Sequence, residues 1–195
     1  KLQRNDRLNK IRGSINVGGV GAFKSARSLK GFFNKENTKD SPGEKISSPR
    51  LSESTENLFT EKYITGDTIG QGTSGVVKIV TRKSDNKQLV AKIIRIRDVE
   101  FFQQVTKEFD IHKDLNHRNI VRVEELIANE LDEKAFIIME YCKGISLQKK
   151  INLEGRIKES ELVKITNQIL KGIKYMHQNG ICHRDIKPAN IILTN

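Results

Sequence analysis

The segment from Ile181 to Leu193 constrains this chain most, because it sets dense polar chemistry directly before an apolar strand. Its sequence is Ile-Cys-His-Arg-Asp-Ile-Lys-Pro-Ala-Asn-Ile-Ile-Leu. A charge taken out of water costs free energy unless a partner compensates for the lost hydration. We therefore predict a reacting site that supplies such partners to the polar residues, which are His183, Arg184, Asp185, Lys187 and Asn190.

The positive charge of the chain is concentrated in its first fifty residues. The 195-residue sequence has a net charge of +11. Residues 1–50 contain 12 Lys and Arg against 4 Asp and Glu, a net charge of +8, which leaves +3 for the rest. A nucleic-acid-binding domain usually carries its basic residues on the folded surface. We therefore expect no nucleic-acid partner, and binding through residues 1–50 is the weaker alternative.

Residues 1–57 differ in composition from the rest of the chain. They are rich in Ser, Asn, Gly and Lys and show no sustained apolar period. Such a segment cannot bury enough apolar surface to offset chain entropy, so we predict a disordered basic tail over 1–57 and a folded domain over 58–195. The aromatic and cationic residues of Phe23–Phe33 could touch an anionic surface, although a solvated tail is the simpler interpretation.

The sequence predicts neither a membrane segment nor a secretory signal. No run approaches the roughly 20 apolar residues that a bilayer requires, and no apolar run follows the basic start. We expect a cytoplasmic protein, with a nuclear location as the alternative. Because the chain opens on Lys1 and stops at Asn195 directly after a strand-like run, we also expect a fragment of a longer protein.

Apolar periodicity divides the folded domain into a strand-rich part and a helical part. We predict strands over 63–69, 76–80, 89–96, 121–127 and 135–139, a helix from Asp98 to about Leu115, and another beginning near Ser146. The clearest helix is Glu159–Gln178, which Asn179-Gly180 should end. Its predicted core face consists of Leu162, Ile165, Ile169, Ile173 and Met176. These elements indicate an α+β fold.

A glycine-rich turn lies between the first two predicted strands. Gly70-x-Gly72-x-x-Gly75 is followed by a β-branched strand rather than by a helix, which disfavours a dinucleotide-binding fold. Glycines let backbone N–H groups approach phosphate oxygens, because no Cβ intervenes. We therefore predict a hairpin that can approach phosphate groups, and its residues are Ile69, Gly70, Gln71, Gly72, Thr73, Ser74, Gly75, Val76 and Val77.

These motifs together resemble those of eukaryotic-type serine/threonine protein kinases. His-Arg-Asp-x-Lys-Pro-x-Asn resembles the catalytic loop of that family, and its Lys-Pro pair resembles serine/threonine rather than tyrosine kinases. The similarity covers about 63–193, and the loop spelling is similar to the calcium/calmodulin-dependent group. It implies a protein-kinase-like fold with a complete small lobe, made of a five-stranded antiparallel sheet plus helix C. The implied boundaries are about 58–140 for the small lobe, 140–144 for the hinge and 145–195 for the start of a helical large lobe.

The resemblance also implies a role for individual residues. Asp185 would orient the substrate hydroxyl, Lys187 would neutralise the transferring phosphoryl group, and Asn190 would bind Mg²⁺. Lys92, held by Glu108 of the helix, would pair with the phosphates of ATP. The glycine hairpin, residues 69–77, would cover the phosphates of ATP. The other implied ATP-binding residues are Val90 above the adenine, Met139 behind it, and the hinge residues Glu140 and Cys142.

The chain departs from the kinase pattern in three ways. His112 takes an apolar position one turn after Glu108, where we expect an imidazole to weaken the active alignment, and Val90 replaces the usual alanine. Asp-Phe-Gly would lie beyond Asn195, so we expect this chain by itself to be inactive. For an active kinase, the implied partners are a protein substrate and a regulatory protein. A regulatory pseudokinase is the alternative.

Overall fold

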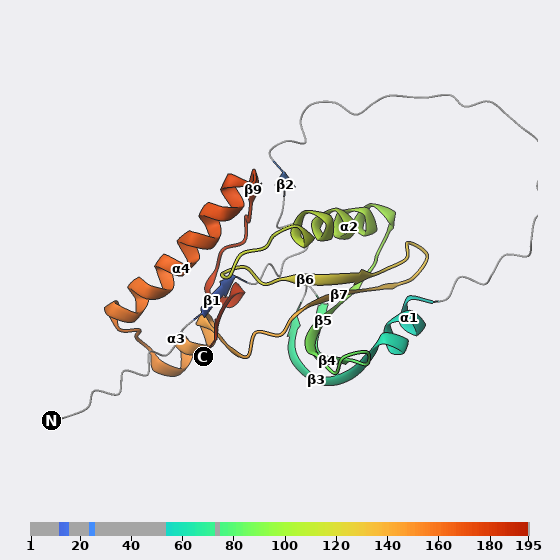
Figure 1. Cartoon of the computed structure of the whole chain (residues 1–195), viewed down its shortest axis with the longest axis horizontal. Helices are drawn as coiled ribbons and strands as arrows, with labels where there is room; N and C mark the ends of the chain where they lie inside the picture. Colours follow the sequence, from blue (N-terminus) through green and yellow to red (C-terminus); the bar gives the residue numbers. More distant parts are fainter. Residues whose placement is uncertain (1–11, 16–23, 26–53, 73–74, 195) are drawn as a thin grey trace, which may run out of the picture.

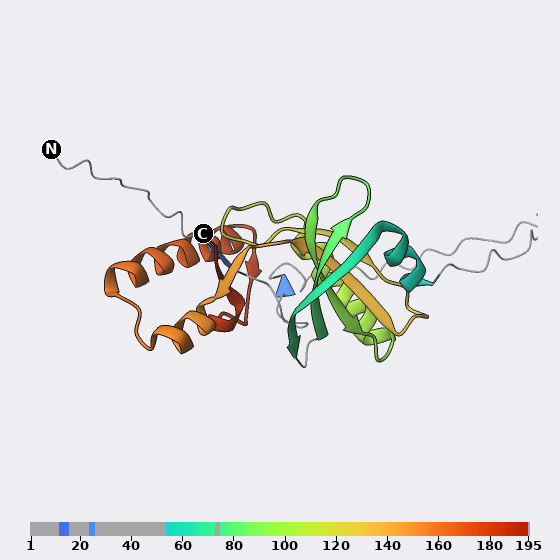
Figure 2. The same ribbon diagram turned by 90° about the horizontal axis from the view of Figure 1, so that it is seen from below.

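The computed structural model describes residues 12–15, 24–25, 54–72 and 75–194. Its elements form two groups, which lie on either side of the segment after strand β7 (Lys134–Glu140) (Figures 1 and 2). The first group is a five-stranded sheet with helices α1 (Thr55–Lys62) and α2 (Val99–Lys113). The second contains α3 (Leu147–Glu154), α4 (Glu159–Gln178) and short strands.

The large sheet is antiparallel throughout. Its strand order is β3-β4-β5-β7-β6. The remaining strand bounds are β3 (Tyr63–Gly72), β4 (Gly75–Arg82), β5 (Gln88–Arg95) and β6 (Val123–Ile127). The five predicted strands are therefore confirmed within a few residues, and so is the α+β fold class with a five-stranded antiparallel sheet and one long helix.

Strand β5 is buried on both faces, so its sequence is a nearly continuous apolar run. Leu89 and Ala91 belong to a core cluster on one face, together with Phe59 of α1. Val90 and Ile94 belong to clusters on the opposite face. Because side chains alternate along a strand, Lys92 lies on the same face as Val90 and Ile94.

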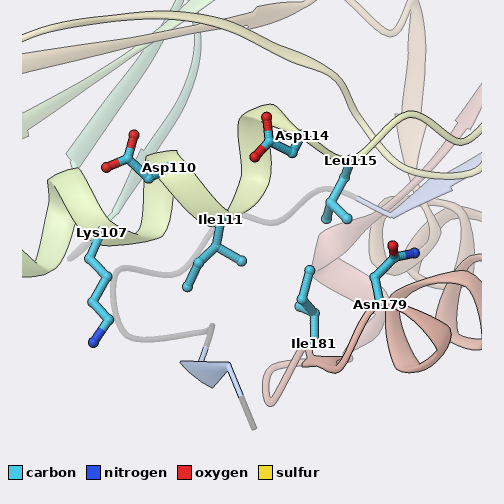
Figure 3. Close-up of a pocket in the computed structure, with 7 residues that line it drawn as sticks. All are labelled: Lys107, Asp110, Ile111, Asp114, Leu115, Asn179 and Ile181. Carbon is cyan, nitrogen blue, oxygen red and sulfur yellow. The ribbon is translucent and has the colours of Figure 1, made fainter. Parts of the chain in front are cut away.

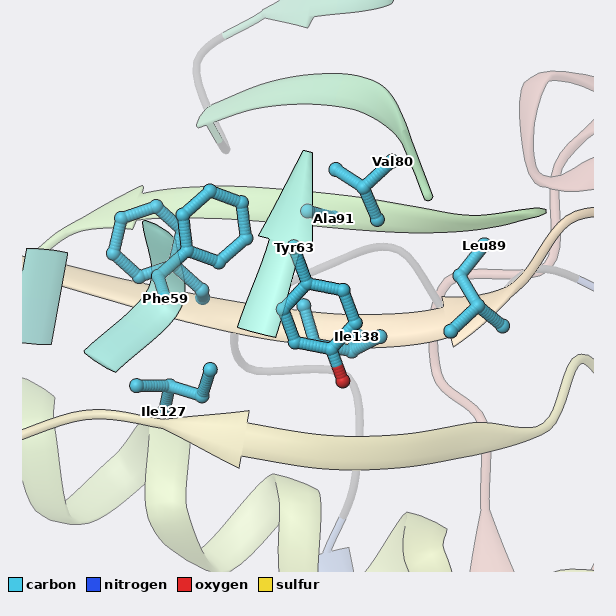
Figure 4. Packing of buried hydrophobic residues seen from close by; sticks show 8 residues of the cluster. Phe59, Tyr63, Val80, Leu89, Ala91, Ile127 and Ile138 are labelled. Atoms are coloured by element: carbon cyan, nitrogen blue, oxygen red, sulfur yellow. The ribbon is translucent and has the colours of Figure 1, made fainter. Parts of the chain in front are cut away.

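Helix α1 extends the folded part of the chain toward the N-terminus. Its N-cap is Ser54, and the Thr55 amide donates to the Asp132 carboxylate at 2.6 Å. The Phe59 ring stacks on Phe136 with centroids 4.1 Å apart, and Figure 4 shows Phe59 among the buried residues of this cluster. This helix therefore begins three residues before residue 58, where the folded domain was predicted to start. An eight-residue helix has too little apolar periodicity to stand out, and its packing decides that it forms.

Helix α2 covers the other face of the sheet, above β6 and β7 in Figure 1. The Asp98 carboxylate caps its N-terminus by accepting from the Phe101 amide at 2.7 Å. Val105 is fully buried in the helix and packs with Ile94 and Ala135 of the sheet. The predicted helix from Asp98 is thus confirmed.

Helix α4 has the predicted bounds, and Gly180 follows it with a φ of +70°. Ile165 and Met176 are fully buried. The predicted core position Leu162 was wrong, because its side chain is 45% exposed near the helix start. Among the described helices, none is long and apolar enough to cross a membrane.

Short strands complete the second group. Strand β10 (Ile191–Thr194) pairs with β8 (Gly144–Ser146) and, on its other edge, with β1 (Arg12–Ile15). Strand β9 (Ile181–Cys182) pairs with β2 (Lys24–Ser25). Strands β1 and β2 fall within the tail predicted to be disordered, and the rest of that tail up to residue 53 lies outside the described residues.

The stacking of α1 on the sheet predicts a large effect of Phe59→Ala. Removing a buried aromatic ring should lower the free energy of unfolding by about 3–5 kcal/mol, because a cavity replaces the ring between Phe136 and Tyr63. Urea unfolding of the full-length protein would measure this. Leu131→Ala is the control, since Leu131 is 81% exposed and should change stability by less than about 0.5 kcal/mol. Equal effects of the two variants would contradict the packing role of α1.

Candidate active site

The polar segment after β9 folds into a constrained loop. His183 is buried, and its Nδ1 accepts a hydrogen bond from the Asp185 amide at 3.1 Å. Arg184 between them has a φ of +64°, in the left-handed region that non-glycine residues rarely adopt. The loop then enters a 3₁₀ turn, Pro188–Asn190, and continues as β10. Strand β9 before the loop, and the turn and β10 after it, hold its two ends in place.

Three side chains of this loop converge. The Asp185 carboxylate lies 2.9 Å from the Lys187 ammonium. The Asn190 amide nitrogen donates to the same Asp185 oxygen and to the Asp185 backbone carbonyl, both at 2.9 Å. The structure therefore brings together the two predicted catalytic residues and the predicted metal ligand.

Asp185 is electrostatically prepared to remain ionised. Its hydrogen bond from Lys187 lowers the pKa of the carboxyl group, and the bond from Asn190 and the charge of His183 act in the same direction. A carboxylate in this state can accept a hydrogen bond from a hydroxyl group. The loop can thus orient an alcohol toward an electrophile.

The glycine-rich hairpin forms as predicted between β3 and β4. Gly72 pairs with Gly75, Gln71 with Val76, and Gly70 with Val77. The side chain of Ile69 before them is 50% exposed. Thr73 and Ser74, the predicted tip of the hairpin, lie outside the described residues.

Gly75 is the hairpin position at which only glycine fits. Its φ is +119°, and a Cβ atom there would lie 2.1 Å from the Ile93 carbonyl oxygen of β5. Gly72 has no heavy atom within 4 Å of such a Cβ. The two glycines therefore serve different purposes, since Gly75 permits close strand packing and Gly72 leaves open space at the hairpin end.

Lys92 lies on β5, opposite Val77 of the hairpin strand in the sheet register. Its side chain is 5% exposed, and this burial lowers the pKa of the ammonium group. The negative charge of Glu108 on α2 opposes that shift. Lys92 and Glu108 thus form the electrostatic pair that the sequence predicted between the third strand and the helix.

An apolar wall continues from the hairpin to the end of β7. Val90 and Met139 pair across β5 and β7 and are both buried. They belong to one cluster, against which Val77 and Cys142 pack. This cluster collects the predicted adenine-side residues on the sheet face that also carries Lys92.

Glu140 at the end of β7 is held by a reciprocal contact with Arg122. The Glu140 amide donates to the Arg122 carbonyl, and the Arg122 amide donates to the Glu140 carboxylate, each at 2.9 Å. An adenine edge could therefore meet the Glu140 backbone only at its carbonyl oxygen. The sequence had not predicted a role for Arg122, because a contact made by its backbone leaves no side-chain signal.

Two hollows among the described residues lie away from these side chains. One of about 380 Å³ lies between the last turns of α2 and the connection from α4 to β9, and Figure 3 shows Asp110 and Asp114 at its rim. Another, of about 540 Å³, lies around Tyr63 and Arg82. Neither of these two hollows is lined by a predicted ATP-binding, catalytic or metal-binding residue.

The described residues fit a magnesium ion that is coordinated mainly by the phosphates of a bound nucleotide, with few protein oxygens. Asn190 offers an amide oxygen, because its nitrogen is used in the bonds to Asp185. Within the described part of the chain, no group of three or more His, Cys, Asp or Glu could hold a metal. Mg²⁺ commonly binds through one or two protein oxygens together with substrate phosphates. Asn190 would be one such ligand.

Comparison with known proteins identifies the family. A model of the protein kinase domain matches residues 63–195. The chain belongs to the protein kinase family. The five-stranded sheet with α2 is accordingly the kinase small lobe, and α3, α4 and the polar loop are the start of the large lobe.

Several kinases are similar to this chain. The serine/threonine-protein kinase cds1 of Schizosaccharomyces pombe is 36% identical over 138 residues, which cover 66% of this chain and 29% of that kinase. CBL-interacting serine/threonine-protein kinase 8 of Arabidopsis thaliana is 36% identical over 135 residues, covering 68% and 30% respectively. Serine/threonine protein kinase OSK3 of Oryza sativa is 35% identical over 136 residues, covering 68% and 26%. The chain spans less than a third of each of these relatives.

The two glycines of the hairpin provide a matched test. Gly75→Ala should lower the affinity for ATP about tenfold or more, because the new Cβ meets the Ile93 backbone and a strained backbone costs roughly 1–3 kcal/mol. Gly72→Ala should change it less than about threefold, since the space there is open. Titration of the full-length protein with a fluorescent ATP analogue would measure both. Equal affinities of the two variants would contradict the packing assigned to Gly75.

Proposed function

We propose that the protein of which this chain is part is a serine/threonine protein kinase, which transfers the γ-phosphoryl group of ATP to a Ser or Thr hydroxyl of a protein substrate. The observation that carries this proposal is the joined arrangement of Asp185, Lys187 and Asn190 in a member of the kinase family. The names of the similar proteins support the serine/threonine class.

The geometry supports a separate role for each of the three polar residues of the catalytic loop. Ionised Asp185 accepts a hydrogen bond from the substrate hydroxyl and so directs its oxygen at the γ-phosphorus. The Lys187 side chain is 53% exposed beside that carboxylate, where its ammonium group can neutralise the negative charge of the transferring phosphoryl group. A bound Mg²⁺ would neutralise phosphate charge during transfer, and the Asn190 amide oxygen would help to hold it.

The small lobe would bind and aim ATP. Backbone N–H groups of the glycine hairpin would cover the phosphates, and Lys92 would pair with the α- and β-phosphates. The apolar wall of Val77, Val90 and Met139 would face the adenine. The Lys92 ammonium is buried and lies near Glu108, so it is aimed rather than mobile.

Partners and location form part of the same proposal. A kinase of this class needs a protein substrate, and three of the similar proteins are named as CBL-interacting, which supports a regulatory protein as a further partner. We expect a cytoplasmic protein whose basic N-terminal tail could touch anionic surfaces. The similarity to the calcium/calmodulin-dependent group stays a prediction. The pseudokinase alternative is not favoured, because Lys92, Asp185 and Asn190 are all present.

Substitution of the central residues tests the proposal. In the full-length protein, Lys92→Ala and Asp185→Asn should each lower the rate of phosphoryl transfer by about a hundredfold or more, because each removes a group that aligns or stabilises the reacting atoms. Transfer of labelled phosphate to a generic protein substrate, followed by phosphoamino-acid analysis, would measure this. Lys174→Ala on the exposed face of α4 is the control and should keep the rate. Near-normal transfer by either test variant would refute the assigned roles.

The residues that follow Asn195 in the full-length protein offer a second test. An Asp-Phe-Gly motif there would supply the carboxylate that joins Asn190 at the metal, as the kinase family requires. Reading the coding sequence beyond Asn195 is sufficient. A residue other than aspartate at that position would favour the regulatory pseudokinase.

A further inference from the structure

His112 occupies a buried position in the last turn of α2. Its side chain is 4% exposed, and Nε2 lies 2.7 Å from the backbone carbonyl oxygen of Val121. A carbonyl oxygen only accepts hydrogen bonds, so Nε2 must carry the hydrogen and donate it. Burial, together with a smaller effect of nearby His183, lowers the pKa of His112 to about 4, although the hydrogen bond to Val121 opposes this shift. The imidazole is therefore a neutral donor at physiological pH.

The acceptor belongs to a segment that is itself well anchored. Val121 is buried and packs in the cluster with Val90 and Met139. The backbone of the next residue, Arg122, accepts a hydrogen bond from the Glu140 amide and donates one to the Glu140 carboxylate at the end of β7. The bond from His112 thus connects the end of α2 to the part of the sheet that lines the proposed adenine site.

The position of His112 on the helix relates it to Glu108. Residues four apart in an α-helix lie on the same side, one turn above the other. A directional bond at His112 therefore fixes both the rotation of α2 about its axis and its distance from the sheet. These are the two quantities that decide whether Glu108 lies near Lys92.

We propose that His112 is a positioning residue, whose hydrogen bond to the Val121 carbonyl holds α2 where Glu108 faces Lys92. This inference rests on the proposed kinase function, since it assigns His112 a part in aiming Lys92 at ATP. It also reverses the expectation that an imidazole at this apolar position weakens the active alignment. An apolar side chain would fill the same space but would provide no directional contact to the Val121 backbone.

Variants of similar size separate the hydrogen bond from packing. His112→Leu keeps the apolar volume and removes the donor. His112→Gln keeps a donor the same number of bonds from Cα as Nε2, so it can restore the contact. His112→Asn places its donor one bond nearer the backbone, where it is too far from the Val121 carbonyl oxygen to bond it. This variant replaces His112→Leu in the test if the leucine variant does not fold. His177→Leu, on an exposed site of α4, is the control for the same chemical change.

Two measurements on the full-length protein test the proposal. For His112→Leu, amide hydrogen exchange in α2 should be about fivefold to tenfold faster, and kcat/KM for ATP should fall by a similar factor, as expected for one buried hydrogen bond. His112→Asn should behave alike, whereas His112→Gln and His177→Leu should stay within about twofold of the parent protein.

The outcomes that would overturn the proposal are distinct from failure of the kinase function. Unchanged exchange in α2 of the leucine variant, or an effect of His112→Gln as large as that of His112→Leu, would show that the bond does not position the helix. Hydrogen exchange needs no phosphoryl transfer, so it reports on His112 even in an inactive protein. Failure of the proposed function would instead appear as absent transfer by the parent protein.

Discussion

The buried ammonium of Lys92 is the constraint on which the small lobe depends. A charge at the centre of a sheet loses its hydration, and only a nearby opposite charge or ligand compensates for that loss. Glu108 supplies the opposite charge from α2. The helix must therefore lie against this face of the sheet, where Val105 packs with Ile94 and Ala135. The opposite face is closed by α1, and the Tyr63 hydroxyl beside it donates to Glu125 at 2.7 Å.

At the start of the large lobe, charged groups are compensated by contacts within one loop. In its polar loop, Asp185 bonds both Lys187 and Asn190. Helix α4 supports the loop through an apolar cluster in which Met176 packs with Leu115 at the end of α2. The charge pair of the small lobe and the polar triad of the large lobe are thus held in separate frameworks. Contacts around the C-terminal end of α2 join them.

Local signals in the sequence predicted most of the elements correctly. Helix α4 was found with the observed bounds, because its apolar residues recur with helical spacing and a glycine follows it. The errors lie where packing rather than pattern decides. Leu162 fits the apolar stripe of α4 but lies before the part of the helix that meets a partner. Helix α1 forms because Phe59 stacks on the sheet, and β8 because β10 offers an edge.

The sequence alone indicated the chemistry that we propose for this protein. The order and spacing of the glycine hairpin, Lys92, Glu108 and the Asp185 loop were sufficient to indicate a kinase, since each residue type has a specific role in phosphoryl transfer. Only the tertiary structure decided how those residues are held. The hydrogen bond from His112 to Val121 and the contact between Arg122 and Glu140 both use backbone groups, which every residue possesses. Such contacts leave no mark in a sequence, because they depend on where the folded chain brings a carbonyl and a donor together.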